Sequence, residues 1–291
     1  MQKTDLSLIV LNYNGLFWLK KLLPTIKKNY LKQSRYRVEV MVVDNDSSDE
    51  SVKFLKQNFK WVKVLESGKN GGFAFGNNIA LRQENSRYVM LLNSDTEFLP
   101  EQSNLDLAID YLDHHKKVAV LGPRLELSNG SLDWASHRGE PTPWASLTYF
   151  TKLEKLFPQT KLFSQYHLKN LNLKETHPVA AVSGAAMMVR TSAIQKVGLL
   201  DESFFMYGED LDWCHRFRDA NYEVVFYPEI KIIHHKYKSG IKSDNQKTSS
   251  KIKAYFYDTM LQYYDKYYAD KYPKFIRRLI RYYIFVKKDG R

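Results

Sequence analysis

The sequence has a single cysteine and no long apolar run. Cys214 is the only cysteine among the 291 residues, so no disulfide can form within the chain. One unpaired thiol favours a reducing, cytoplasmic setting. No run of about 18 apolar residues occurs, and the polar residues 1–5 lack the basic and apolar regions of a secretory signal. We therefore expect neither a membrane-spanning helix nor an N-terminal leader.

Repeats, low-complexity segments and the common nucleotide-binding loops are absent as well. The glycine-rich run at 70–78 is not a Walker loop, because no Gly-Lys-Ser/Thr follows it. Its spacing is G-G-x-x-x-G, which also differs from the dinucleotide fingerprint G-x-G-x-x-G. A dinucleotide site is therefore disfavoured. The glycines either let backbone amides approach a phosphate or sugar, or only form a turn before a tightly packed helix.

Positive charge is concentrated at the C-terminal end. The formal net charge is +12, and residues 251–291 hold eleven Lys or Arg against four Asp. A solvated surface is one interpretation of such an excess. Its clustering favours an anionic partner instead: a membrane, nucleic acid or a phosphorylated substrate.

Hydrophobic periodicity predicts an α/β protein. Hydrophobic residues make up 44% of the chain, enough for a large core. Strand and helix patterns alternate in the first half, which indicates a doubly wound, mostly parallel sheet flanked by helices. We expect strands at 6–11, 38–43, 62–65, 88–92, 118–121, 224–227 and 230–234. We expect helices at 16–30 (interrupted near Pro24), 48–59, 76–85, 105–114, 209–220, 251–271 and 274–286. The aromatic, irregular stretch 126–176 is expected to be an excursion that forms a lid or an acceptor-binding segment.

Short polar runs follow three of the predicted strands: Asn12-Tyr13-Asn14, Asp44-Asn45-Asp46 and Asn93-Ser94-Asp95. Such runs can be ordinary turn chemistry. In a parallel sheet, however, the carboxyl ends of the strands lie at one edge, where ligands bind. A carboxylate such as Asp95 at that edge could hold Mg²⁺ or Mn²⁺, which prefer oxygen ligands. The sequence therefore predicts a site at this edge.

Two further segments carry groups suited to catalysis. Glu209 and Asp210 open a predicted helix after an apolar run, so either they cap the helix or one of them acts as a general base at a pocket mouth. Helical spacing puts Asp210 and Trp213 on one face, with Trp213 anchoring the helix. His234-His235 follows a strand, and at most one of the two rings can reach the site. A structural role is the commoner one for such a histidine, and a metal contact is the alternative.

The C-terminal helices combine aromatic and basic residues. An apolar stripe of one predicted helix is flanked by basic residues; the stripe consists of Phe275, Leu279, Tyr282 and Val286. Nine tyrosines lie between 255 and 283. A basic amphipathic helix of this kind can lie at a membrane interface. The alternative is a helix that packs on the catalytic domain and leaves a solvated basic face.

Taken in order, the motifs resemble glycosyltransferase family 2 with the GT-A fold, and its bacterial rhamnosyltransferase-like branch in particular. The resemblance covers roughly residues 5–240. It rests on segments that are modestly specific alone and strongly specific in this order: 8–14, 42–49, 70–78, 91–95, 183–185 and 208–213. It implies a catalytic domain at 1–250, with a nucleotide-sugar part at about 1–125 and an acceptor part at about 126–250. Residues 251–291 would be a basic amphipathic helical tail.

The resemblance implies donor contacts at the strand ends. Asp44 would contact the nucleobase, Asn12 and Asn14 would lie by the nucleotide, and Asn77 would lie near the phosphates or sugar. The remaining expected donor contacts are Asn70, Gly71, Gly72, Asn93 and Ser94. At Asn93 many family members have aspartate, but Asn-x-Asp variants resemble this branch, so metal binding is expected to be retained.

The resemblance also implies the reacting groups. Asp95 matches the last acid of the family's D-x-D and would bind Mg²⁺ or Mn²⁺, with His234 as a further metal contact. Asp210 matches the catalytic base of an inverting transfer, which needs no second carboxylate as nucleophile. Neighbouring residues expected on the acceptor side or in support are Glu209, Asp212 and Trp213.

We therefore expect an inverting, metal-dependent transferase of cell-surface polysaccharide synthesis. The best guess for the donor is dTDP-rhamnose, with UDP-sugars open, and the acceptor is a glycan or lipid-linked glycan. The enzyme would be cytoplasmic, held by its tail on the anionic inner face of the plasma membrane. A nucleotidyltransferase would want a basic glycine-rich loop near residue 12, which is absent. A non-catalytic membrane or polyanion-binding module leaves the strand-end acids unexplained, and nucleic acid is not expected because these acids would repel phosphate.

Overall fold

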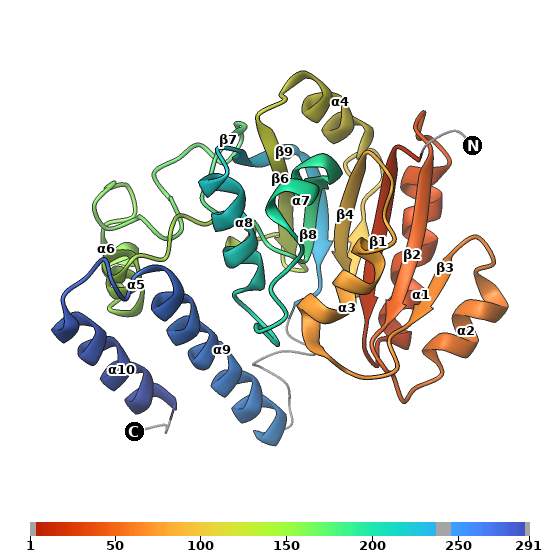
Figure 1. Ribbon diagram of the computed structural model, residues 1–291. Helices are drawn as coiled ribbons and strands as arrows, with labels where there is room; N and C mark the ends of the chain where they lie inside the picture. The colour runs from red at the N-terminus through yellow and green to blue at the C-terminus, as the bar shows by residue number, and fades with distance from the viewer. Residues whose placement is uncertain (1–3, 237–245, 289–291) are drawn as a thin grey trace.

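The computed structural model describes residues 4–236 and 246–288, with side chains in the second range from 253 onward. Its centre is a nine-stranded mixed sheet in the order β3-β2-β1-β4-β8-β6-β9-β5, with β7 paired to β9 (Figure 1). The strands are β1 Leu6–Asn12, β2 Val38–Asp44, β3 Lys63–Glu66, β4 Tyr88–Asn93, β5 Thr96–Phe98, β6 Val118–Leu127, β7 His177–Pro178, β8 Ala186–Arg190 and β9 Glu223–His234.

Ten α-helices are found in the described ranges. They are α1 Leu16–Ile26, α2 Ser51–Asn58, α3 Gly72–Leu81, α4 Asp106–His114, α5 Pro143–Phe150, α6 Leu153–Leu156, α7 Thr191–Val197, α8 Glu209–Asp219, α9 Gln246–Tyr267 and α10 Lys274–Lys288. None of them has the length and hydropathy that crossing a bilayer requires. The predicted α/β sheet, the flanking helices and the C-terminal helices are thus confirmed.

Parallel pairing brings the polar strand ends together. β1 lies between β2 and β4, and its register places Asn12 beside Asp44 and Leu11 beside Asn93. Alternate residues of β1 face opposite sides of the sheet, as strand geometry requires. Leu8 packs with α1, α2 and α4 on one side, and Ile9 packs with α3, α7 and α8 on the other. The two buried layers fix the edge at which the candidate site lies.

The second half of the sheet contains antiparallel strands. β8 runs antiparallel to both β4 and β6, and β5 runs antiparallel to β9. The sheet is therefore more mixed than the expected mostly parallel one, because the pattern of a fully buried strand does not encode its direction. The two strands expected at 224–227 and 230–234 form the single strand β9. Its register against β6 shifts between Pro123 and Arg124, and this bulge accommodates Pro228 within the strand.

The first helix is not interrupted at Pro24, where the sequence suggested a break. It lies inside α1, and the chain continues through a π-helical turn at Lys27–Leu31. The expected irregular excursion at 126–176 contains a 3-10 turn at Trp134–Ser136 and the short helices α5 and α6. These helices gather with α9 and α10 at the side of the molecule opposite α1 and α2 (Figure 1).

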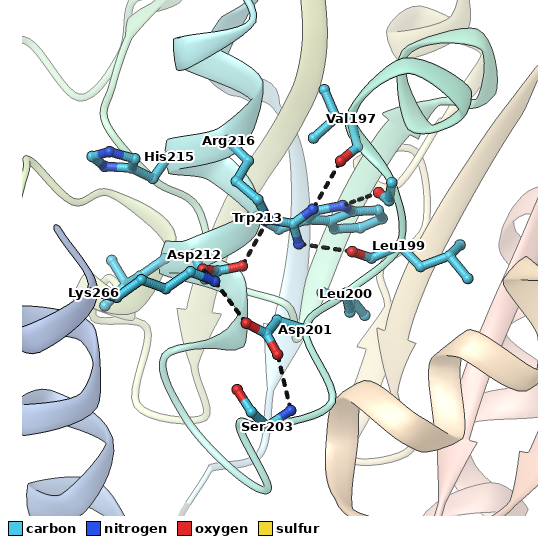
Figure 2. A network of polar contacts seen from close by, with 12 residues as sticks. Val197, Leu199, Leu200, Asp201, Ser203, Asp212, Trp213, His215, Arg216 and Lys266 are labelled. Atoms are coloured by element: carbon cyan, nitrogen blue, oxygen red, sulfur yellow. Dashed lines mark hydrogen bonds and ion pairs between the residues drawn. The ribbon is translucent and has the colours of Figure 1, made fainter.

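α9 is fastened to α8 through a buried polar network (Figure 2). Asp212 is fully buried and accepts hydrogen bonds from Lys266 at 2.6 Å, Tyr267 at 2.6 Å and Arg216 at 2.8 Å. Lys266 also pairs with Asp201 at 2.6 Å, in the loop before α8. A buried carboxylate is tolerated when its oxygens are saturated in this way. α9 therefore packs on α8 and on the loop before it.

Candidate active site

One cavity of about 1730 Å³ extends from the carboxyl ends of β1 and β4 to the C-terminal helices. It is lined on the sheet side by Asn93 and Asp95 and on the helix side by Glu209 and Asp210. The two acidic groups that the sequence analysis singled out, at Asp95 and Asp210, thus open onto a shared space. Such a shared space is required if both groups take part in one reaction.

The Asp95 side of the cavity is built by the pairing of β5 with β9, which sets Thr96 opposite His234. The Nε2 atom of His234 lies 3.4 Å from Oδ1 of Asp95, and its Nδ1 atom lies 2.8 Å from Oδ2 of Asp133. Lys236 pairs with the other Asp133 oxygen at 2.9 Å. Burial lowers the pKa of His234, but the Asp133 and Asp95 carboxylates outweigh it and raise that pKa to about 9. The charge and hydrogen bonds of His234 and Lys236 outweigh the effect of burial on Asp133 and lower its pKa.

The donor atoms at this end fit a divalent ion that also binds a substrate. A carboxylate that holds Nδ1 of a histidine and points Nε2 at the site is the usual support of a metal-binding imidazole. Within residues 4–236 and 246–288, no group of three or more His, Cys, Asp or Glu is placed to hold an ion. Mg²⁺ commonly takes one or two protein ligands and completes its shell with waters and substrate phosphates. Asp95 suits that mode, and His234 can join it as a ligand once the ion displaces the proton on Nε2.

The Asp210 side is built at the start of α8. Gly208 precedes the helix with φ of 79°, and a Cβ there would come within 2.3 Å of Thr259 on α9. The turn therefore needs glycine. Oδ2 of Asp210 accepts hydrogen bonds from Arg138 at 2.7 Å and from the Gly184 amide at 3.1 Å. These two donors hold the carboxylate in one orientation at the cavity wall.

Glu209, next to Asp210, has the perturbed pKa. Its side chain is buried, and its Oε2 atom has no hydrogen-bond partner among the described residues. Burial, followed by the charge of Asp210, raises the pKa of Glu209 to about 8. The structure thus places a carboxyl group with a raised pKa directly beside the expected base.

Several expected donor contacts lie at the sheet edge. Asn70 and Gly72 line the cavity with Asn93. Asn12 donates to Asp44 at 2.9 Å, and Asn14 accepts from the Ser48 amide at 2.8 Å; these three residues sit beside the cavity and do not line it. Gly71 and Ser94 are likewise neighbours of lining residues.

Three expected site residues point elsewhere. Asn77 is fully buried and donates to the Phe73 carbonyl at 3.0 Å within α3, away from the cavity lining. Trp213 is fully buried and donates to the Gly198 carbonyl at 2.9 Å, which matches its expected anchoring position. Asp212 faces α9. Helical spacing did not distinguish the cavity face of α3 and α8 from the packed face.

The sequence analysis missed Asp133, Arg138 and Asn45. Asp133 and Arg138 belong to the 126–176 excursion, which was expected to form a lid or an acceptor segment but contained no residue singled out. Asn45 lines the cavity and donates to Asn70 at 3.0 Å. A buried arginine has to meet a carboxylate, but which carboxylate depends on the fold.

Comparison with known proteins identifies the family. The sequence matches the family description "Glycosyl transferase family 2" over residues 7–198. The chain belongs to glycosyl transferase family 2. The resemblance seen in the sequence motifs is therefore confirmed.

Two curated relatives of this family 2 chain match over most of its length. The low-salt glycan biosynthesis hexosyltransferase Agl10 of Haloferax volcanii is 30% identical over 79% of this chain and 67% of the relative. The N-acetylglucosaminyl-diphospho-decaprenol L-rhamnosyltransferase of Mycobacterium tuberculosis is 28% identical over 68% of this chain and 67% of the relative. The chain thus spans about two thirds of the length of both.

A solved structure supports the fold. The mannosyltransferase PcManGT from Pyrobaculum calidifontis, solved with GDP-Man and Mn²⁺, superposes with a TM-score of 0.57. The match covers 98% of this chain and 70% of that chain at 13% identity. At this identity the likeness speaks for the fold alone, and it confirms the expected GT-A fold.

Proposed function

We propose that this chain is an inverting glycosyltransferase that moves a sugar from a nucleotide-diphosphate donor to an acceptor hydroxyl. The observation that carries the proposal is the single cavity shared by the Asp95–His234 pair and the Asp210–Arg138 pair. One end suits a diphosphate and the other suits a proton acceptor. The sequence from 1 to about 125 would hold the donor, and the part from about 126 to 250 would hold the acceptor.

In the proposed mechanism, Asp210 takes the proton from the acceptor hydroxyl, and the oxygen attacks the anomeric carbon on the face opposite the diphosphate. The Arg138 guanidinium and the Gly184 amide keep the carboxylate oriented during the transfer. A single displacement inverts the anomeric configuration. General-base assistance of this kind contributes about 10²–10⁴-fold to the rate.

Asp95 and His234 would hold Mg²⁺ or Mn²⁺, which when bound offsets the negative charge that develops on the leaving diphosphate. The carboxylate of Asp133 orients His234 from behind, and Lys236 adds a positive charge to the same cluster. The Mn²⁺ in the PcManGT structure supports a divalent ion in a site of this fold. Donor contacts are proposed from Asn70, Gly72 and Asn93, with Asp44 contacting the nucleobase and Asn12 and Asn14 lying by the nucleotide.

The Mycobacterium relative is named as a rhamnosyltransferase, which supports dTDP-rhamnose as our preferred donor. UDP-sugars are the alternative. The same relative is named for an acceptor carried on diphospho-decaprenol, which supports a lipid-linked glycan acceptor and a role in polysaccharide synthesis. The basic C-terminal helices support a place on an anionic surface such as the cytoplasmic face of the plasma membrane.

The proposal is tested with purified full-length chain and a panel of nucleotide sugars. Thermal shift with and without Mn²⁺ identifies the donor, and transfer from that donor is followed by nucleotide release. NMR of the product gives its anomeric configuration, which should be opposite to that of the donor. Retention of configuration would contradict the single displacement, and failure of every donor to bind or react would favour a non-catalytic binding module.

A further inference from the structure

The cavity is larger than a donor requires, and its excess volume is apolar. Pockets for small ligands measure about 300–1,000 Å³, whereas this one measures about 1730 Å³. Beyond Asp210 it continues between α5 on one side and α9 and α10 on the other. We call this part the apolar arm. Its walls include Phe150, Met260, Ile276, Ile280 and Tyr283.

The apolar arm opens at a rim that is itself hydrophobic. Leu147 of α5 and Leu279 and Tyr282 of α10 line the cavity and are 50%, 59% and 68% exposed. The rings of Phe150 and Tyr283 are in contact, with centroids 5.2 Å apart, so they form a wall of the arm at which α5 meets α10. The cavity lining extends from Asp210 to the exposed rim residues of these helices, which lie together in Figure 1.

Exposed hydrophobic side chains are concentrated around this rim. Ten of the thirteen large ones in the described ranges lie between 144 and 162 or between 275 and 285: Trp144, Leu147, Tyr149, Leu156, Phe157, Leu162, Phe275, Leu279, Tyr282 and Phe285. Concentration of this kind in two segments that contact each other through Phe150 and Tyr283 marks an interaction site and not the ordinary scatter of apolar residues. The surface therefore has a partner of apolar character.

Charge identifies the kind of partner. Every exposed charged residue in 143–161 and in 271–288 is basic, because Glu154, the one acid there, is buried against His167 and Lys169. Asp258 and Asp265 of α9 pair with Lys288, Arg277 and Arg281, whereas Lys274 and Arg278 have no acidic partner among the described residues. A second copy of the chain would oppose basic surface to basic surface. An anionic bilayer satisfies both the apolar and the basic residues.

We propose that the apolar arm receives the hydrocarbon chain of a membrane-borne acceptor while the rim rests on an anionic bilayer. This rests on the proposed function, because it assigns the route by which the proposed lipid-linked acceptor reaches Asp210. The hydrocarbon chain of the acceptor would pass from the bilayer between α5 and α10 without crossing water. The hydroxyl at the polar end of the acceptor would then reach the carboxylate of Asp210. Burial of this hydrocarbon chain would contribute to the affinity for the acceptor in proportion to the length of the hydrocarbon.

The arm is tested by calorimetric titration of the full-length chain with two probes that share a head group. Geranylgeranyl diphosphate should bind roughly tenfold or more tightly than dimethylallyl diphosphate, since only the longer chain fills the arm. Ser146→Trp places a ring in the arm and should abolish this difference. Gln57→Trp adds the same ring on exposed α2 and should preserve it. Equal affinities of wild type for the two probes would overturn the proposal.

The rim is tested by co-sedimentation with phosphatidylcholine vesicles with and without phosphatidylglycerol. Lys274→Glu/Arg278→Glu should weaken binding to the anionic vesicles by about tenfold or more. Lys28→Glu/Lys32→Glu makes the same charge change on two exposed residues in and just after the π-helical turn at Lys27–Leu31 and should have little effect. No vesicle binding by wild type, or an equal loss in both variants, would refute the rim.

Neither measurement involves a sugar donor or turnover. Chain-length preference and vesicle binding without transfer from any donor would count against the proposed function alone. Transfer without either property would count against the arm and the rim alone. The two proposals therefore fail separately.

Discussion

Replacing Asp210 by asparagine removes a proton acceptor and also the counter-ion of a buried arginine. Arg138 is 7% exposed and donates to Asp210 at 2.7 Å and to the Val182 carbonyl at 2.8 Å. The amide oxygen of the new side chain can still accept from Arg138 and from the Gly184 amide. The charge is lost, and so is the hydrogen bond that the other carboxylate oxygen accepts from the Leu211 amide at 2.7 Å, because an amide nitrogen cannot accept it. The variant is therefore expected to lose both activity and stability, for different reasons.

The two losses have separate magnitudes. Removing the general base should lower turnover by about 10²–10⁴-fold. Leaving Arg138 without its counter-ion should lower the free energy of unfolding by about 2–3 kcal/mol, toward the low end for a broken buried pair because the hydrogen bonds from Arg138 and the Gly184 amide remain. Arg138→Met in the same chain removes the orphaned charge. The double variant should regain much of the lost stability and stay inactive.

The assay is a double-mutant cycle of Asp210→Asn, Arg138→Met and both together. Urea unfolding gives the free energies, and nucleotide release from the donor gives turnover. The double variant should be more stable than the sum of the two single effects by about 1–3 kcal/mol. Additive effects within about 0.5 kcal/mol would refute the ion pair. Near-normal turnover of Asp210→Asn would remove Asp210 from the role of base.

Three further predictions concern Glu209, Asp95 and Lys266. The folded chain holds a proton on Glu209 up to about pH 8, and the unfolded chain releases it near pH 4.5, so stability falls as pH rises through that window. Glu209→Gln should therefore melt at a higher temperature than wild type above pH 8 and at the same temperature near pH 4. A difference that does not depend on pH would contradict the assignment. Asp95→Asn removes a charge that faces His234 and should melt lower than wild type without ligand at neutral pH. It should also lose the Mn²⁺-dependent part of the shift caused by the donor nucleotide, whereas an unchanged shift would exclude Asp95 as a ligand. Lys266→Met removes one of the cations that pair with the buried Asp212 carboxylate and should lower the free energy of unfolding in urea by about 1–3 kcal/mol. An effect no larger than that of Lys28→Met on the surface would contradict the proposed attachment of α9.

Local chemistry in the sequence was sufficient for the main elements of the fold. Alternating strand and helix patterns predicted the α/β sheet, and the polar runs after the strands predicted the edge that carries Asn93 and Asp95. Both signals are local, since side-chain periodicity reports burial and a strand end is marked by the residues that follow it. The ordered motifs added the family, which the comparisons confirm.

Tertiary structure alone decided which charged groups meet. Arg138 reaches Asp210 across 72 positions and Asp133 reaches His234 across 101, and no periodicity relates such distant residues. It also decided which face of α3 and α8 is packed, so that Asn77 and Trp213 point into the core while Glu209 and Asp210 face the cavity. The direction of β8 and the apolar arm between α5 and α10 likewise depend on elements that come together only on folding. The local sequence determines which side chains of a segment prefer to be buried. The packing of distant segments determines which residues those side chains contact.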